Sequence, residues 1–115
     1  MSTIVELLLD TAQADTDVLM KNDALGDVLS IPRDVDFLLR APDAGKAQLV
    51  ADFINDNRYG NAIAQSDEAG HRVSVHIHMP ITQNIICAVS GLMACISQIF
   101  DLDYDGWGST IQAGP

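Results

Sequence analysis

The segment Tyr104–Gly108 holds more groups capable of specific chemistry than any other short stretch of the chain. It contains the single tryptophan, Trp107, between two glycines, and the carboxylates of Asp103 and Asp105 lie close to that ring in the sequence. An aromatic ring rimmed by carboxylates suits an arginine-rich segment, because a guanidinium pairs with carboxylates and stacks on rings. Asp103, Asp105 and Trp107 are therefore the candidate partner-binding residues. The alternative interpretation is that Trp107 is a core plug at the end of a strand.

The same segment resembles the first half of a calcium-binding loop. Asp101, Asp103, Asp105 and Gly106 follow the pattern D-x-D-x-D-G, but the position that needs a bidentate glutamate is Gln112. The pattern is therefore incomplete, and we expect no metal site here.

A pair of histidines, His76 and His78, is the second candidate site. The two lie two residues apart in a run that alternates apolar and polar side chains. On a strand both imidazoles leave the same face, where they could ligate a transition metal or bind a small molecule together with Arg72. The competing interpretation, which we prefer, is that they are polar residues on the uncovered face of an antiparallel sheet. A metal- or ligand-binding domain is kept as the alternative function.

The sequence offers little for catalysis. It has no glycine-rich phosphate loop and no basic clamp, and Cys87 and Cys95 fall in a predicted packed helix where a thiol is not activated. Their separation corresponds to about 12 Å along a helix, which is too far for a disulfide. We expect a non-enzymatic protein of a reducing compartment, without cofactor or metal.

Charge restricts the class of partner. The chain has 115 residues, with 16 acidic and 6 basic side chains and a net charge of −10. Such a surface opposes direct binding of nucleic acid and of anionic membranes, since both carry negative charge. Such charge either keeps the chain soluble or serves to bind a basic partner, and we expect a basic protein segment as the partner. Residues 1–30 hold six of the acidic side chains and one basic side chain, so the charge is concentrated in the N-terminal part.

Apolar periodicity divides the chain into helices and strands. Thr3 and Glu6 have the spacing of a capping box that opens a helix through Ala12, and a second short helix is possible within residues 14–30. Pro42–Asp43 begins another helix, which we expect Gly60 to end in a left-handed conformation. Apolar runs, most of them alternating, predict strands over residues 34–40, 61–65, 72–79 and 102–109.

The last predicted helix, Gln83–Phe100, has two distinct faces. One face is strongly apolar, and the other is small and uncharged, with Cys87, Ser90 and Gly91 among its residues. We therefore expect the small face to be covered as well, by the N-terminal helix or by a second subunit in a homodimer. Residues 79–100 are long enough to span a bilayer, but their polar residues and acidic downstream flank favour a buried amphipathic helix.

The order strand–helix–strand–strand–helix–strand is the ferredoxin-like pattern of the α+β class. It predicts a four-stranded antiparallel sheet with two helices on one face. Residues 1–30 form a helical arm ahead of the ferredoxin-like domain at residues 31–115, within one globular unit.

The stretch Phe100–Gly108, with the sequence FDLDYDGWG, strongly resembles the closing motif of the family called regulator of ribonuclease E activity B. Residues Pro32–Phe37, the helix start at Pro42–Asp43 and the exit at Tyr59–Gly60 are similar to the same family. The resemblance implies a ferredoxin-like fold and an acidic bacterial protein of the cytoplasm. It also implies a non-enzymatic inhibitor that binds the endoribonuclease through an arginine-rich scaffold region and alters transcript turnover.

One feature departs from that family. Members often carry an acidic extension beyond the tryptophan motif, whereas Ser109–Pro115 contains no acidic residue. If such an extension binds the basic partner, this chain binds that partner more weakly or binds another one.

Overall fold

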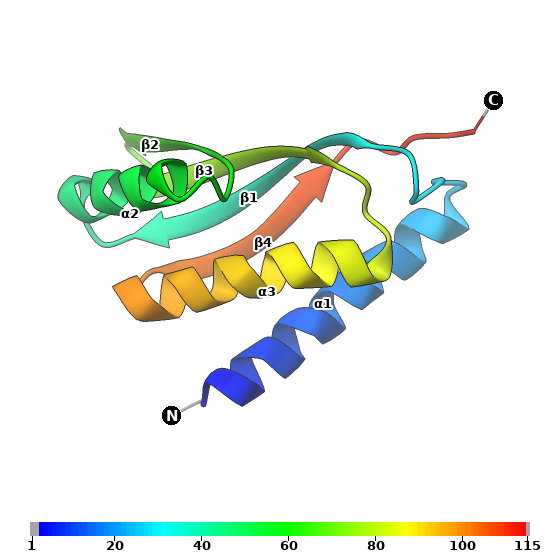
Figure 1. Ribbon diagram of the computed structural model, residues 1–115, viewed down its shortest axis with the longest axis horizontal. Coiled ribbons are helices and arrows are strands. Elements are labelled where there is room, and N and C mark those ends of the chain that lie inside the picture. Colours follow the sequence, from blue (N-terminus) through cyan, green and yellow to red (C-terminus); the bar gives the residue numbers. More distant parts are fainter. Residues whose placement is uncertain (1–2, 115) are drawn as a thin grey trace.

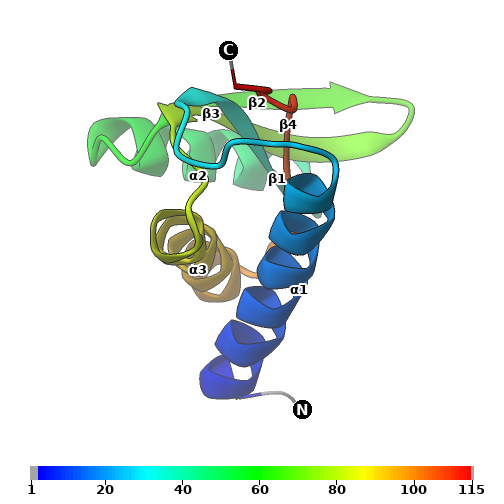
Figure 2. The ribbon, with the colours of Figure 1, turned by 90° about the vertical axis from the view of Figure 1, so that its right-hand side faces the viewer.

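The chain forms a four-stranded antiparallel sheet with helices packed on one of its faces. The structure is a computed structural model that describes residues 3–114. The strands follow the order β2-β3-β1-β4, and α2 and α3 cover one face while α1 crosses α3 on the side away from α2 (Figures 1 and 2). This is the predicted ferredoxin-like arrangement with an additional N-terminal helix. The elements are α1 Ile4–Ala24, β1 Arg33–Ala41, α2 Ala44–Asp56, β2 Asn61–Asp67, β3 Gly70–Met79, α3 Gln83–Phe100 and β4 Asp103–Ser109.

Alternation along the strands separates the core from the open face of the sheet. On β1, Val35, Phe37 and Leu39 are fully buried beneath the helices. Between them Asp34 and Asp36 are exposed on the opposite face. This period of two is the one that the sequence predicts for a half-buried strand.

The helix α3 is buried on both of its faces, as its composition predicts. Ser90, Ala94 and Ser97 on the small face are buried, and a Cβ built on Gly91 would lie 3.5 Å from Leu8 Cδ2 of α1. The N-terminal helix therefore covers this face, and no second subunit is needed to do so. α3 is also the one helix among residues 3–114 that is long and apolar enough to cross a membrane.

The helical arm corrects one prediction. Residues 4–24 form the single helix α1, capped by the Thr3 side chain that accepts a hydrogen bond from Glu6 N. The second short helix expected within residues 14–30 is therefore the continuation of the first. The aspartates that suggested a break do not interrupt α1, because most of its polar side chains are exposed to solvent. α1 ends where Gly26 takes a φ of 88°.

The end of α2 corrects another prediction. Asp43 caps the start of α2 as expected, accepting a hydrogen bond of 2.7 Å from Lys46 N. The left-handed residue after α2 is Arg58, with φ 58°, and not Gly60. Gly60 is required for a different reason: a Cβ there would lie 2.7 Å from Val75 Cγ1.

A buried ion pair joins the segment after α1 to β1 and to the C-terminal segment. Arg33 Nη1 lies 2.7 Å from both carboxylate oxygens of Asp27, and both side chains are almost fully buried, with 1% and 0% exposed. The guanidinium also donates to the carbonyls of Val28, Ile31 and Thr110. One cation therefore holds together three segments of the chain.

Candidate partner-binding site

A β-bulge in β4 determines where the aromatic residues of the Tyr104–Gly108 segment point. Phe37 of β1 pairs with Trp107, and Leu39 pairs with Tyr104. The one β1 residue between Phe37 and Leu39 therefore faces two β4 residues, those between Tyr104 and Trp107. Gly106, one of those two, has a φ of 87°, a conformation that glycine adopts without strain. Because of the extra residue, Tyr104 and Trp107 lie on the same face of the sheet although they are three positions apart.

Both aromatic residues bind polar groups of the helices. Trp107 Nε1 donates to Asp15 Oδ1 of α1 at 2.9 Å, and the Tyr104 hydroxyl lies 2.7 Å from Ser90 Oγ of α3. Asp15 is 4% exposed, and Trp107 is half-buried against the core. This hydrogen bond therefore joins α1 to β4. The arrangement agrees with the interpretation of Trp107 as a residue that packs on the core at the end of a strand.

Burial controls the ionisation of this network. Burial raises the pKa of Asp15 above its ordinary value, and the hydrogen bond from Trp107 opposes part of that rise. Burial likewise raises the pKa of Tyr104. Burial, followed by the nearby Asp15 carboxylate, raises the pKa of the Cys87 thiol, so Cys87 is not poised as a thiolate nucleophile.

The other two candidate residues, Asp103 and Asp105, are exposed on β4. Asp105 Oδ2 accepts from Arg40 Nε at 3.1 Å, and Asp103 lies opposite Arg40 in the strand register. Asp101 is the left-handed C-cap of α3, with φ 59°. The aspartates of the half-matched calcium pattern thus belong to a helix cap and an extended strand, not to a loop that wraps an ion.

Two adjoining hollows lie between α1 and β4, and we call them together the α1–β4 groove. They have volumes of about 290 and 180 Å³ and share Thr11 and Tyr104. Asp10 of the helical arm thereby lies on the same surface as Asp103 and Asp105. The two acidic segments that are far apart in the sequence become one acidic surface. The groove is lined by Leu7, Asp10, Thr11, Ala14, Asp15, Ala94, Ser97, Gln98, Leu102, Asp103, Tyr104, Asp105 and Gly106.

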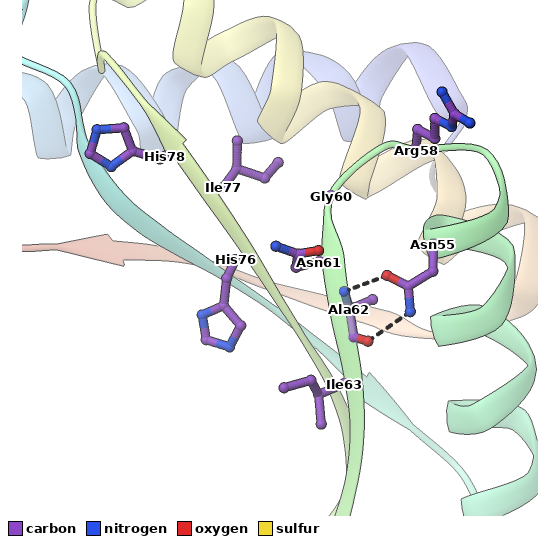
Figure 3. A pocket seen from close by; sticks show the side chains of 9 residues that line it. All are labelled: Asn55, Arg58, Gly60, Asn61, Ala62, Ile63, His76, Ile77 and His78. Atoms are coloured by element: carbon purple, nitrogen blue, oxygen red, sulfur yellow. Dashed lines mark hydrogen bonds between the residues drawn. The ribbon is translucent and has the colours of Figure 1, made fainter.

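The two histidines lie on the open face, each beside an aspartate of β1. His76 Nδ1 is hydrogen-bonded to Asp36, and His78 Nδ1 lies 2.9 Å from Asp34 Oδ1. Both imidazoles line a wide open hollow that continues towards Arg58 (Figure 3). No cluster of three or more metal-ligating side chains occurs among residues 3–114. The pair therefore has carboxylates that could orient it, but lacks the third ligand of a metal site.

The chain matches a known protein family over most of its length. Residues 12–109 match the model of the family described as regulator of ribonuclease activity B. The chain belongs to this family. A comparison with curated proteins gave no match. The resemblance seen in the sequence is thus confirmed, and it extends into α1 as well as over the ferredoxin-like domain.

Membership in the regulator of ribonuclease activity B family makes the chain a regulatory protein that acts on ribonuclease activity. Asp15 and Trp107, which join α1 to β4, both lie within the matched residues, whereas Asp10 lies outside them. The sequence analysis missed Asp15, although a signal was present. Asp15 lies at helical spacing on the same face of α1 as Leu8, Ala12 and Leu19, and this face is otherwise apolar.

Because of the bulge, Gly106 should tolerate substitution less well than the other glycine of this motif. We expect Gly106→Ala to lower the free energy of unfolding by about 1–2 kcal/mol, the cost of forcing an L-residue into a left-handed conformation. The matched control is Gly108→Ala: its φ is not positive and an added Cβ would meet nothing within 4 Å. Urea unfolding followed by tryptophan fluorescence measures both. Equal effects of the two changes would show that the bulge conformation is not required.

Proposed function

We propose that this regulator acts by direct contact with its ribonuclease, binding a basic segment of the enzyme on the acidic surface along the α1–β4 groove. The main support is the arrangement of charge: Asp10, Asp103 and Asp105 all line the two adjoining hollows of the groove. Of these carboxylates, only that of Asp105 forms an ion pair within residues 3–114. The others are available to an arginine or lysine of the partner.

The helical arm contributes acidic side chains beside the tryptophan motif. α1 presents Glu6, Asp10 and Asp17 as exposed side chains, and the helix is held against β4 by the Trp107–Asp15 hydrogen bond. Because these acidic side chains are held on a folded helix, they lose less conformational entropy on binding than side chains of a flexible segment would.

We propose further that the protein is non-catalytic and works in the cytoplasm. Support comes from the environment of its nucleophiles, since burial raises the pKa of Cys87, and from its two free cysteines, which suit a reducing compartment. Homodimerisation, the other partner expected from the sequence, stays a prediction.

A binding measurement at two salt concentrations tests the proposal. Purified full-length chain should bind the purified endoribonuclease of the same organism and alter its cleavage rate. Its affinity should fall about tenfold or more between roughly 0.05 and 0.5 M salt, because the screening length of exposed charges shortens from about 14 Å to about 4 Å over that range. Isothermal titration calorimetry measures the affinity. Absence of binding at the lower salt concentration would contradict the proposal.

A further inference from the structure

The two edges of the sheet differ in how their backbone groups are satisfied. On the outer edge of β2, the Asn55 side chain donates to Ala62 O at 2.9 Å and accepts from Ala62 N at 2.8 Å (Figure 3). This amide imitates a neighbouring strand at Ala62. Natural sheets commonly block an edge in this manner against pairing with another chain. The β2 edge is therefore blocked at Ala62.

The β4 edge has no such protection within residues 3–114. β4 pairs with β1 on its inner side only. Apart from this pairing with β1, no backbone hydrogen bond joins residues 103–109 to α1 or to another segment of residues 3–114. The outward N–H and C=O groups of β4 are thus free to pair with an added strand, a recognised mode of peptide binding.

Two buried polar atoms beside this edge also lack partners. Asp15 Oδ2 and Ser97 Oγ are each inaccessible to solvent and form no hydrogen bond in the structure. Their residues are 4% and 2% exposed, respectively, and both line the α1–β4 groove. An unpaired buried polar group costs free energy, and a donor that entered the groove would remove that cost.

The charge around the β4 edge determines which kind of added strand can bind there. A second copy paired at the same edge would bring Asp103 and Asp105 close to their own equivalents, which is unfavourable for like charges. An added strand presents side chains alternately to both faces of the sheet. One row would lie by Asp103 and Asp105, and the other would lie over Asp10 and Asp15. Carboxylates on both sides match a segment rich in arginine or lysine.

We infer that the ribonuclease segment binds as an extended, arginine-rich strand added to the outer edge of β4, with cationic side chains in the α1–β4 groove. This rests on the proposed function and specifies its geometry. The peptide backbone supplies hydrogen bonds to β4, while the guanidinium groups supply donors to Asp10, Asp15 and Asp105.

Amide hydrogen exchange on the full-length chain tests this geometry directly. Saturating amounts of the purified endoribonuclease, and separately of a poly-arginine peptide, are added to the chain. Exchange at amides of residues 103–108 is expected to slow by about tenfold or more, whereas the amides of β2 should be unchanged. If the endoribonuclease binds while exchange in β4 is unaltered, the strand-addition geometry is wrong and the proposed function stands. If the endoribonuclease does not bind, the proposed function itself fails.

A charge reversal in the groove provides the second test. Asp10→Lys is expected to weaken binding of the endoribonuclease by about tenfold or more, because it places a cation where the partner's cation binds. The matched control is Asp52→Lys on α2, which makes the same change in net charge at an exposed position outside the groove. It should alter the affinity less than about threefold. Equal losses in the two variants would overturn the assignment of the groove, and circular dichroism checks that both variants fold.

Discussion

Replacing Arg33 by methionine is expected to lower the free energy of unfolding by about 3–5 kcal/mol, since removal of one partner from a buried ion pair leaves an uncompensated charge. The Asp27 carboxylate would lose its two 2.7 Å contacts with Nη1 in a site where its side chain is 0% exposed. Three backbone carbonyls would each lose the hydrogen bond that the guanidinium donates. Because small domains are stable by only about 5–15 kcal/mol, this single change removes a large part of the total.

Urea unfolding followed by the fluorescence of Trp107 measures the effect. The matched control is Arg40→Met, which removes an exposed pair with Asp105, where the side chains are 49% and 50% exposed. It should cost less than about 1 kcal/mol. Adding Asp27→Leu to Arg33→Met should recover part of the stability, since it removes the unpaired carboxylate. A cost for Arg33→Met as small as that of the control would contradict the assigned role.

Trp107→Phe is expected to lower the free energy of unfolding by about 1.5–3 kcal/mol, the range for a lost hydrogen bond to a charged group. Phenylalanine retains much of the ring packing on β4 but cannot donate to Asp15. Both oxygens of that buried carboxylate would then lack a partner, since Oδ2 has none already. The loss should weaken the attachment of α1, which makes few other contacts with β4. Circular dichroism follows unfolding here, because the variant contains no tryptophan.

Combination with Asp15→Asn measures how much the carboxylate charge contributes to this hydrogen bond, since the amide oxygen of asparagine can still accept from Trp107 Nε1. Asp15→Asn alone should stabilise the chain at neutral pH, because the folded state disfavours the charged carboxylate: burial raises the pKa of Asp15. This gain should shrink as the pH falls towards the unfolded pKa, where both states hold the proton. The double-mutant cycle should show a coupling of about 1 kcal/mol between the two positions. Additive effects would mean that the carboxylate charge does not strengthen the hydrogen bond from Trp107.

Local sequence patterns were sufficient for most of the secondary structure. Alternation along residues 34–40 and 72–79 predicts β1 and β3 because a strand half-covered by helices buries every second residue. The caps at Thr3 and Asp43 follow from side-chain chemistry within four residues. The FDLDYDGWG motif identified the family. Local patterns misjudged Gly60, because its requirement comes from Val75 on another strand.

The sequence analysis overlooked two charged residues that occupy positions where the periodic pattern predicts apolar side chains. Asp15 lies on the apolar face of α1. Arg33 lies two residues before Val35, at the spacing of the buried positions of β1. Both are buried in the structure and paired with residues far along the chain or across a loop. A buried charge needs a partner, but its identity depends on which segments the fold brings together.

The sequence by itself therefore determined the ferredoxin-like order of elements, the acidic character and the family, since these depend on local periodicity, composition and a contiguous motif. Only the tertiary structure decided what the tryptophan motif does. The bulge at Gly106 turns both aromatic rings towards the helices, where Trp107 binds Asp15, 92 residues away in the sequence. The same packing of α1 against α3 and β4 joins two separate acidic segments along one groove. That juxtaposition arises from long-range packing, which no local pattern in the chain records.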